Sequence, residues 1–324
     1  MKIGVFAVLF QNLPLGQALD KIKGFGVNTV EIGCGNYPGT AHCNPVELLA
    51  DDQKIQAFVD EFKSRGMTIS ALSAHGNMVH PNKEFAKANH EAWRNAVLLA
   101  EKLGIDTVVN FSGCPGDSEQ STNPNWVTCA WPPDYMQILD WQWNEVLIPY
   151  WKREAAFARA HGVTKIALEM HPGFCVYNPE TLLRLRDAVG PEIGANFDPS
   201  HLIWQGIDPC LAIKDIGKAG AMFHFHAKDT FVDQHNTARN GVLDTKSYAV
   251  MSERSWIFRS VGYGMGEQKW RDIVSSLRLA GYDGALSIEH EDALASTDEG
   301  LKKAVECLKE VVFEEPMLTE AYWV

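Results

Sequence analysis

Eight short apolar segments, each followed by a longer segment with helical periodicity, constrain the fold of this chain more than any other feature. The apolar segments are Ile3–Leu9, Thr29–Ile32, Thr68–Leu72, Thr107–Phe111, Lys165–Glu169, Ile193–Asp198, Met222–Lys228 and Ala285–Glu289. The helical segments are Leu15–Gly24, Pro45–Arg65, Glu84–Leu103, Tyr135–His161, Pro179–Val189, Pro209–Lys218, Glu267–Ala280 and Thr297–Val311. Strands that alternate with helices predict a parallel sheet, and eight is the number that closes a (β/α)8 barrel.

An open, doubly wound sheet is the alternative fold, but no Gly-x-Gly-x-x-Gly follows the first strand to support it. A chain of 324 residues has a usual length for one barrel, so we expect a single domain over residues 1–311 and a C-terminal tail over residues 312–324. Residues 112–134 and 230–266 form unusually long connections after predicted strands. They would lie on the face where barrel enzymes carry their active sites.

The first long connection and the segment after it are rich in tryptophan. Five of the ten Trp residues are at positions 126, 131, 141, 143 and 151. This segment could form a lid that packs on the barrel, a subunit interface or a surface that contacts substrate.

Charge and composition exclude several classes of partner. The formal net charge of −12 argues against nucleic acids and anionic membrane surfaces, because their binders need a basic face. No apolar run approaches the roughly 18 residues of a spanning helix, and Met1–Phe10 does not resemble a secretory signal. The seven Cys residues include no Cys-x-x-Cys pair. We therefore expect a cytoplasmic protein, in a reducing compartment, that acts on a small molecule.

Four predicted strands in succession end in an acid or an imidazole. The segments are Ala167-Leu-Glu-Met-His-Pro172, Asn196-Phe-Asp-Pro-Ser-His201, Phe223-His-Phe-His-Ala-Lys-Asp229 and Ser287-Ile-Glu-His-Glu291. A carboxylate where barrel strands converge is costly unless a metal or a cation satisfies it. Three carboxylates and one imidazole suit Mn²⁺, which we expect first, and also Mg²⁺ or Co²⁺, with Zn²⁺ possible.

The alternation of a strand distinguishes the two histidines of the third segment. His224 and His226 are two residues apart and point into the barrel, whereas Phe223, Phe225 and Ala227 face the helices. His226 is nearer the C-terminal end and should reach the metal. His224 lies one layer deeper, where it is either a core histidine or a substrate contact.

These segments resemble the sugar isomerase and epimerase superfamily with the xylose-isomerase-like barrel. Its members include ketose 3-epimerases, inosose dehydratases and apurinic endonucleases. The resemblance covers nearly the whole chain and is most specific in Asp-x-x-His after strand six and His-x-His-x-Lys-Asp on strand seven. It implies a TIM barrel whose metal ligands are Glu169, Asp198, His226 and Glu289. It also implies that Glu169 and Glu289 serve as acid/base groups.

Other residues are candidates for the pocket around this metal. His171 lies two residues beyond Glu169 and is a candidate catalytic base. His201 should lie at the pocket wall and contact substrate. His75, after the third strand, and Glu31, at the end of the second, are candidates for contacts with substrate hydroxyls, as is His224. Lys228 either binds substrate or pairs with Asp229.

A metal in this site would polarise a sugar carbonyl and stabilise the enediolate formed when the neighbouring C–H loses its proton. Return of that proton gives epimerisation or isomerisation, which is the predicted function. The alternative is β-elimination from a 3-keto sugar, as in the metal subunits of C-glycoside deglycosidases, with His171 as base and a small second subunit. A non-catalytic barrel subunit is the third possibility. We expect a sugar or sugar derivative as ligand and a homo-oligomeric assembly.

Overall fold

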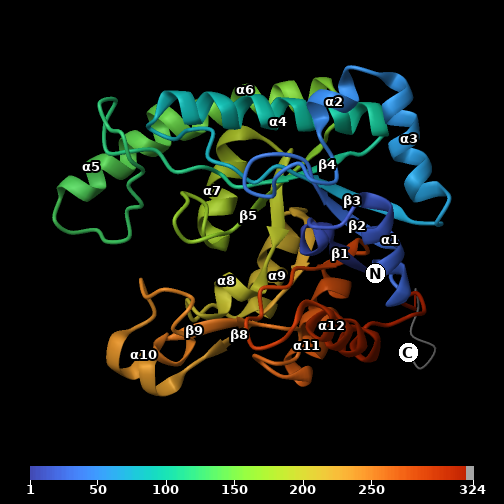
Figure 1. The fold of residues 1–324 in the computed structure, drawn as a ribbon. Helices are drawn as coiled ribbons and strands as arrows, with labels where there is room; N and C mark the ends of the chain where they lie inside the picture. The colour runs from blue at the N-terminus through green and yellow to red at the C-terminus, as the bar shows by residue number, and fades with distance from the viewer. Residues whose placement is uncertain (319–324) are drawn as a thin grey trace.

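The computed structural model describes residues 1–318, and its centre is a closed barrel of parallel strands (Figure 1). The strand order is β1-β10-β7-β6-β5-β4-β3-β2, and β1 pairs with both β10 and β2 to close the barrel. The strands are β1 (Lys2–Phe6), β2 (Thr29–Gly33), β3 (Thr68–Ser73), β4 (Thr107–Asn110), β5 (Lys165–Glu169), β6 (Ile193–Phe197), β7 (Met222–Ala227) and β10 (Ala285–Ile288). The predicted eight-stranded barrel is confirmed, and the open doubly wound sheet is wrong.

Helices surround the barrel on its outer side (Figure 1). The helices of the described residues, of which α5 and α10 project away from the barrel, are α1 (Leu15–Gly24), α2 (Pro45–Leu49), α3 (Asp52–Lys63), α4 (Lys83–Leu103), α5 (Asp134–Trp141), α6 (Ile148–Ala160), α7 (Pro179–Val189), α8 (Pro199–Ile203), α9 (Pro209–Lys218), α10 (Gln234–Asn240), α11 (Glu267–Leu279) and α12 (Thr297–Val311). Short helical turns are η1 (Ala7–Phe10), η2 (Gln142–Leu147) and η3 (Met251–Glu253). No helix of the described part of the chain has the length and hydropathy needed to cross a membrane.

Two predicted helices are interrupted in the structure. The segment 45–65 divides into α2 and α3, because Asp51 is extended and its side chain accepts a hydrogen bond from the backbone N–H of Gln53. The segment 135–161 continues through a π-helical turn, η2, between α5 and α6. Helical periodicity alone shows neither a new N-terminal cap nor a local change in helical pitch.

The long connection over residues 230–266 is more ordered than predicted. Within it, β8 (Asp229–Val232) pairs antiparallel with β9 (Trp256–Arg259), and α10 lies between them. The connections that carry α5 and α10 project on the same side of the molecule (Figure 1). The tail beyond α12 is non-helical as far as residue 318, and positions 319–324 of the predicted tail lie outside the described residues.

The orientation of Phe223 corrects the alternation predicted for β7. The pairing of β6 with β7 shifts register between Ala195 and Asn196, so Phe223 has no partner residue on β6. Its ring packs with Ala71, Val109 and Ala167 in a cluster separate from the main core between strands and helices. Gly194 makes room for this ring, because a Cβ there would lie 2.3 Å from Cδ2 of Phe223. Phe223 therefore fills the barrel interior below the site.

Candidate metal centre

Glu169, Asp198, His226 and Glu289 converge at the carboxyl ends of four neighbouring strands. Glu169 ends β5, Asp198 directly follows β6, and Glu289 directly follows β10. His226 lies one residue before the end of β7, and these four strands are neighbours in the barrel. One potential ligand atom from each of the four side chains lies within 4.8 Å of the others. The structure thus brings the predicted ligand set together, and the first three side chains are almost fully buried.

Two buried atoms of this group make no hydrogen bond of good geometry among the described residues, although charged groups lie close to both. They are Asp198 Oδ2, which lies 3.0 Å from Lys228 Nζ, and His226 Nδ1. His226 Nδ1 faces two carboxylates, at 3.2 Å from Glu169 Oε2 and 3.3 Å from Glu289 Oε2. Buried polar atoms normally have partners, since leaving them unsatisfied costs free energy. The poor hydrogen-bond geometry of these two atoms and the oxygen-rich donor set therefore fit a divalent cation.

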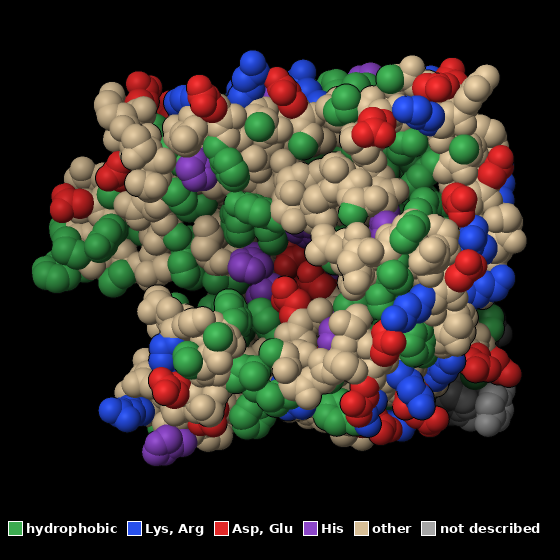
Figure 2. All heavy atoms as spheres, viewed as in Figure 1, with side chains coloured by type: hydrophobic (Ala, Val, Ile, Leu, Met, Phe, Trp, Pro, Cys, Tyr) green, Lys and Arg blue, Asp and Glu red, His purple; other side chains and the backbone are tan. Residues whose placement is uncertain are grey.

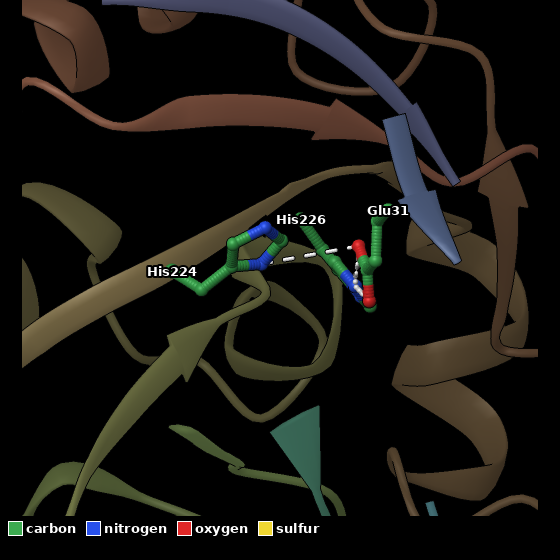
Figure 3. A group of neighbouring side chains, drawn as sticks. All are labelled: Glu31, His224 and His226. Carbon is green, nitrogen blue, oxygen red and sulfur yellow. Dashed lines mark hydrogen bonds and ion pairs between the residues drawn. The ribbon is translucent and has the colours of Figure 1, made fainter. Parts of the chain in front are cut away.

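Glu31 on β2 orients the imidazole of His226 (Figure 3). Its carboxylate oxygens lie 2.9 and 3.0 Å from His226 Nε2, and it also accepts a 2.7 Å hydrogen bond from Ser287 Oγ. Burial raises the pKa of Glu31, but the imidazoles of His226 and His224 lower it to about 2. With Nε2 donating to Glu31, Nδ1 is the nitrogen available to a metal. Because Glu31 is fully buried and does not line the cavity, its geometry favours this positioning role over the predicted substrate contact.

His224 lies one layer deeper than His226, as the strand alternation predicts. Its Nδ1 is 2.9 Å from Asn196 Oδ1, and its Nε2 is 3.2 Å from Ser70 Oγ. Burial lowers its pKa to about 4, so the ring is neutral at neutral pH. Both ring nitrogens are occupied and the side chain does not line the cavity. Of the two predicted roles, this geometry favours the core histidine.

A cavity of about 240 Å³ opens above the four side chains. Figure 2 shows it as a hollow with carboxylates at its floor and histidines at its edge. Its polar wall consists of His75, Glu169, His171, His201, Lys228, Glu289 and Glu291. The apolar and aromatic part of its lining consists of Phe6, Val8, Tyr37, Pro38 and Phe111, and the ring of Phe111 lies beside those of His75 and His171.

Three histidines that were predicted to surround the metal line this cavity. His75 Nε2 lies 3.0 Å from Glu169 Oε2, and His201 Nε2 lies 3.1 Å from Glu169 Oε1. His171 Nδ1 lies 2.6 Å from the carbonyl oxygen of Pro172 and donates to it, which leaves Nε2 as an acceptor. Burial lowers the pKa of His171 to about 4. His75 and His201 thus hold Glu169 in place, and His171 has the protonation state of a base.

Lys228 does not pair with Asp229, which corrects one of its two predicted roles. Its Nζ lies 2.6 Å from Glu289 Oε2, 2.9 Å from Glu291 Oε2 and 3.0 Å from Asp198 Oδ2. Asp229 instead accepts hydrogen bonds from Trp270 Nε1 and from backbone N–H groups of the segment 262–265. Neighbouring residues on an extended chain point to opposite sides, so the two side chains separate.

Sequence reasoning missed two residues next to Lys228. Glu291 belongs to the segment Ser287–Glu291 at the end of the last strand, but its spacing from the other acids indicates no role. Phe258 comes from β9, which was not predicted. Its ring centre is 4.6 Å from Lys228 Nζ and 5.3 Å from the ring centre of His201.

A closed parallel barrel with acids and imidazoles gathered at the carboxyl ends of its strands defines an α/β barrel with a candidate metal centre. Comparison with known families makes the assignment more specific. The sequence pattern of the xylose isomerase-like TIM barrel family matches residues 19–311, and the chain belongs to that family. It is 38% identical to the uncharacterized protein YfiH of Bacillus subtilis, over 96% of this chain and 99% of that protein.

Solved structures share the fold at lower identity. The probable 3-DHS dehydratase AsbF from Bacillus anthracis has a TM-score of 0.67 at 15% identity and covers 95% of this chain and 99% of its own. A D-tagatose 3-epimerase-like protein has a TM-score of 0.63 at 21% identity, with 96% and 98% covered. The IolI protein with a bound zinc atom has a TM-score of 0.64 at 18% identity, with 97% and 100% covered.

Proposed function

We propose that the chain is a divalent-metal-dependent isomerase or epimerase that removes a proton next to the carbonyl of a keto sugar. The observation that carries the proposal is the convergence of Glu169 and Glu289 on Nδ1 of His226, with Asp198 as a fourth donor. The fold shared with a D-tagatose 3-epimerase-like protein and with zinc-bound IolI supports it. Mn²⁺ is the first ion to test, because this donor set is rich in oxygen.

The bound ion would act as a Lewis acid toward the carbonyl oxygen. Glu169 and Glu289 then supply two carboxylates, one to take a proton from the adjacent carbon and one to return a proton. Burial raises the pKa of each. Hydrogen bonds from the imidazoles around Glu169, and the charge of Lys228 beside Glu289, lower both pKa values below the usual range. Both groups therefore start as carboxylates, the form that accepts a proton. One takes the proton from the substrate carbon, and the other must first gain a proton from solvent before it can return one to that carbon.

Lys228 and the apolar wall complete this chemistry. Lys228 lines the cavity, where its ammonium group would stabilise negative charge that develops on a substrate oxygen. Phe6 and Phe111, which also line the cavity, would limit access of water to the reacting carbon.

A second candidate function is β-elimination with His171 as base. It rests on one observation, that Nδ1 of His171 donates to Pro172 and leaves a neutral Nε2 available in the cavity wall. The shared fold of a probable dehydratase supports it. A small second subunit belongs to this alternative only.

Hydrogen exchange tests the proposed function. Metal analysis of the purified protein comes first. The metal-stripped and Mn²⁺-loaded forms are then incubated with ketoses and 3-keto glycosides in D₂O and followed by NMR. We expect deuterium next to the carbonyl only with the loaded form, and none with Glu169→Gln or Glu289→Gln. Exchange that survives stripping, or a product without deuterium, contradicts the mechanism. Complete loss of turnover in a metal-loaded His171→Ala variant favours elimination, whereas a modest loss favours epimerisation.

A further inference from the structure

The polar wall of the cavity carries an excess of negative charge. Glu169, Glu289 and Glu291 line it, and Asp198 lies buried behind them. Among the lining residues within positions 1–318, Lys228 is the one Lys or Arg. Its ammonium group is already within 3.0 Å of three of these carboxylates. With a divalent ion bound and His226 neutral as its ligand, the four carboxylates, the ammonium group and the ion together leave one net negative charge.

In the described part of the chain, the apolar part of the lining offers an aromatic surface and no second cation. Phe111 stacks on Phe174 with ring centres 4.2 Å apart and planes at 17°. Tyr37 lies beside Phe111 at 6.1 Å, and 59% of its surface is exposed at the rim. Aromatic faces of this kind pack against apolar C–H surfaces of a ligand.

We infer that the substrate is an uncharged keto sugar that lies with an apolar face on Tyr37 and Phe111, and that the carboxylates exclude phosphorylated sugars and sugar acids. This inference rests on the proposed function and goes beyond it, because proton abstraction beside a carbonyl is equally possible on a charged sugar. Tyr37 and Glu291 become the residues that decide specificity.

Electrostatics and size both support this choice. A phosphate ester carries about −1.5 to −2 charges at pH 7 and needs cationic donors or backbone N–H groups. At the cavity mouth it would meet the half-exposed carboxylate of Glu291, and like charges repel there. The volume of about 240 Å³ lies below the range of roughly 300–1,000 Å³ for drug-sized ligands. It therefore matches a single sugar ring, and any larger substituent would extend past Tyr37.

The test compares matched neutral and anionic ketoses. The Mn²⁺-loaded protein is given a panel of ketoses, each beside its phosphate ester, such as D-fructose and D-fructose 6-phosphate. Deuterium exchange next to the carbonyl is measured by NMR in D₂O. We expect at least one neutral ketose to exchange with a kcat/KM about 100-fold above that of its ester. An ester that exchanges equally well or better overturns the inference while the proposed function stands. No exchange in either arm contradicts the proposed function itself.

A pair of variants tests the electrostatic origin of the preference. Glu291 is half-exposed, so Glu291→Gln should fold, and it removes one negative charge from the cavity mouth. The preference for the neutral ketose should fall by about fivefold in Glu291→Gln, from Coulomb repulsion at the mouth. Glu306→Gln is the matched control, because Glu306 is exposed on α12 and does not line the cavity. An unchanged preference in Glu291→Gln overturns the assignment of exclusion to these carboxylates.

Discussion

Lys228→Met should destabilise the metal-free protein and increase the stabilisation gained from metal. Lys228 is 2% exposed, and its ammonium group lies 2.6 Å from Glu289 and 3.0 Å from Asp198. Met keeps much of the aliphatic volume but removes the charge that compensates these two carboxylates. Removal of one partner from a buried ion pair costs about 3–5 kcal/mol.

The expected loss can be expressed as a melting temperature. At roughly 2 °C per kcal/mol for a protein of this size, the metal-free variant should melt about 5–10 °C below the wild type. A divalent ion would compensate the same carboxylates. In the variant it no longer competes with the ammonium group of Lys228 for their oxygen atoms. Saturation with Mn²⁺ should therefore restore most of the loss, and the metal-induced rise should be larger in the variant than in the wild type.

Differential scanning calorimetry of stripped and Mn²⁺-saturated protein measures both quantities. Lys102→Met is the control, because Lys102 is exposed and lies 3.4 Å from Asp52 in a surface pair of small expected value. If stripped Lys228→Met melts at the wild-type temperature, the ammonium group does not compensate the carboxylates. If its metal-induced rise is no larger than that of the wild type, the ammonium group and the metal do not compete for the same oxygens.

Three further predictions concern the groups around and below the site. Glu31→Gln removes the anionic partner of His226 and should lower Mn²⁺ affinity by about 10–100-fold in calorimetric titration; unchanged affinity would show that the contact does not orient the ligand. Gly194→Ala places a Cβ against the ring of Phe223 and should destabilise the fold by about 1–3 kcal/mol in urea unfolding, whereas a neutral effect would mean that the ring can move away. His224 has its pKa lowered to about 4 in the folded protein, so the unfolded chain binds more protons between about pH 4 and its ordinary value of 6.5. Stability should therefore rise with pH across that interval, and His224→Gln should flatten the rise in unfolding free energy; an equal slope in both proteins would refute the assignment.

The barrel and the gathering of the four donors were predictable from the sequence because both depend on local patterns. Strand and helix periods are visible in short windows, and the strand ends of a parallel barrel meet at one face. A candidate ligand at or directly after the end of a strand, such as Glu169 or Glu289, is therefore placed by the topology alone. The same alternation selects His226 over His224 without any knowledge of contacts.

The parts that failed depend on pairing between distant segments. Phe223 points into the barrel because β7 slips against β6, and a register shift of this kind is set by tertiary packing against Gly194. Phe258 reaches Lys228 from β9, a four-residue strand that pairs only with β8 and gives a weak sequence signal. The role of Glu31 was missed because its partner lies 195 positions away.

That long separation has a consequence for assembly of the protein. All four donors belong to the segment from β5 to β10, yet the group that fixes the tautomer of His226 comes from β2. A C-terminal half-barrel would contain every donor and still present an imidazole free to rotate. High-affinity binding of the ion should then appear only at the last stage of folding, when the first strands close against the last. Metal uptake by the nascent or refolding chain would consequently report ring closure, and the ion would select against chains that stop at a half-built barrel.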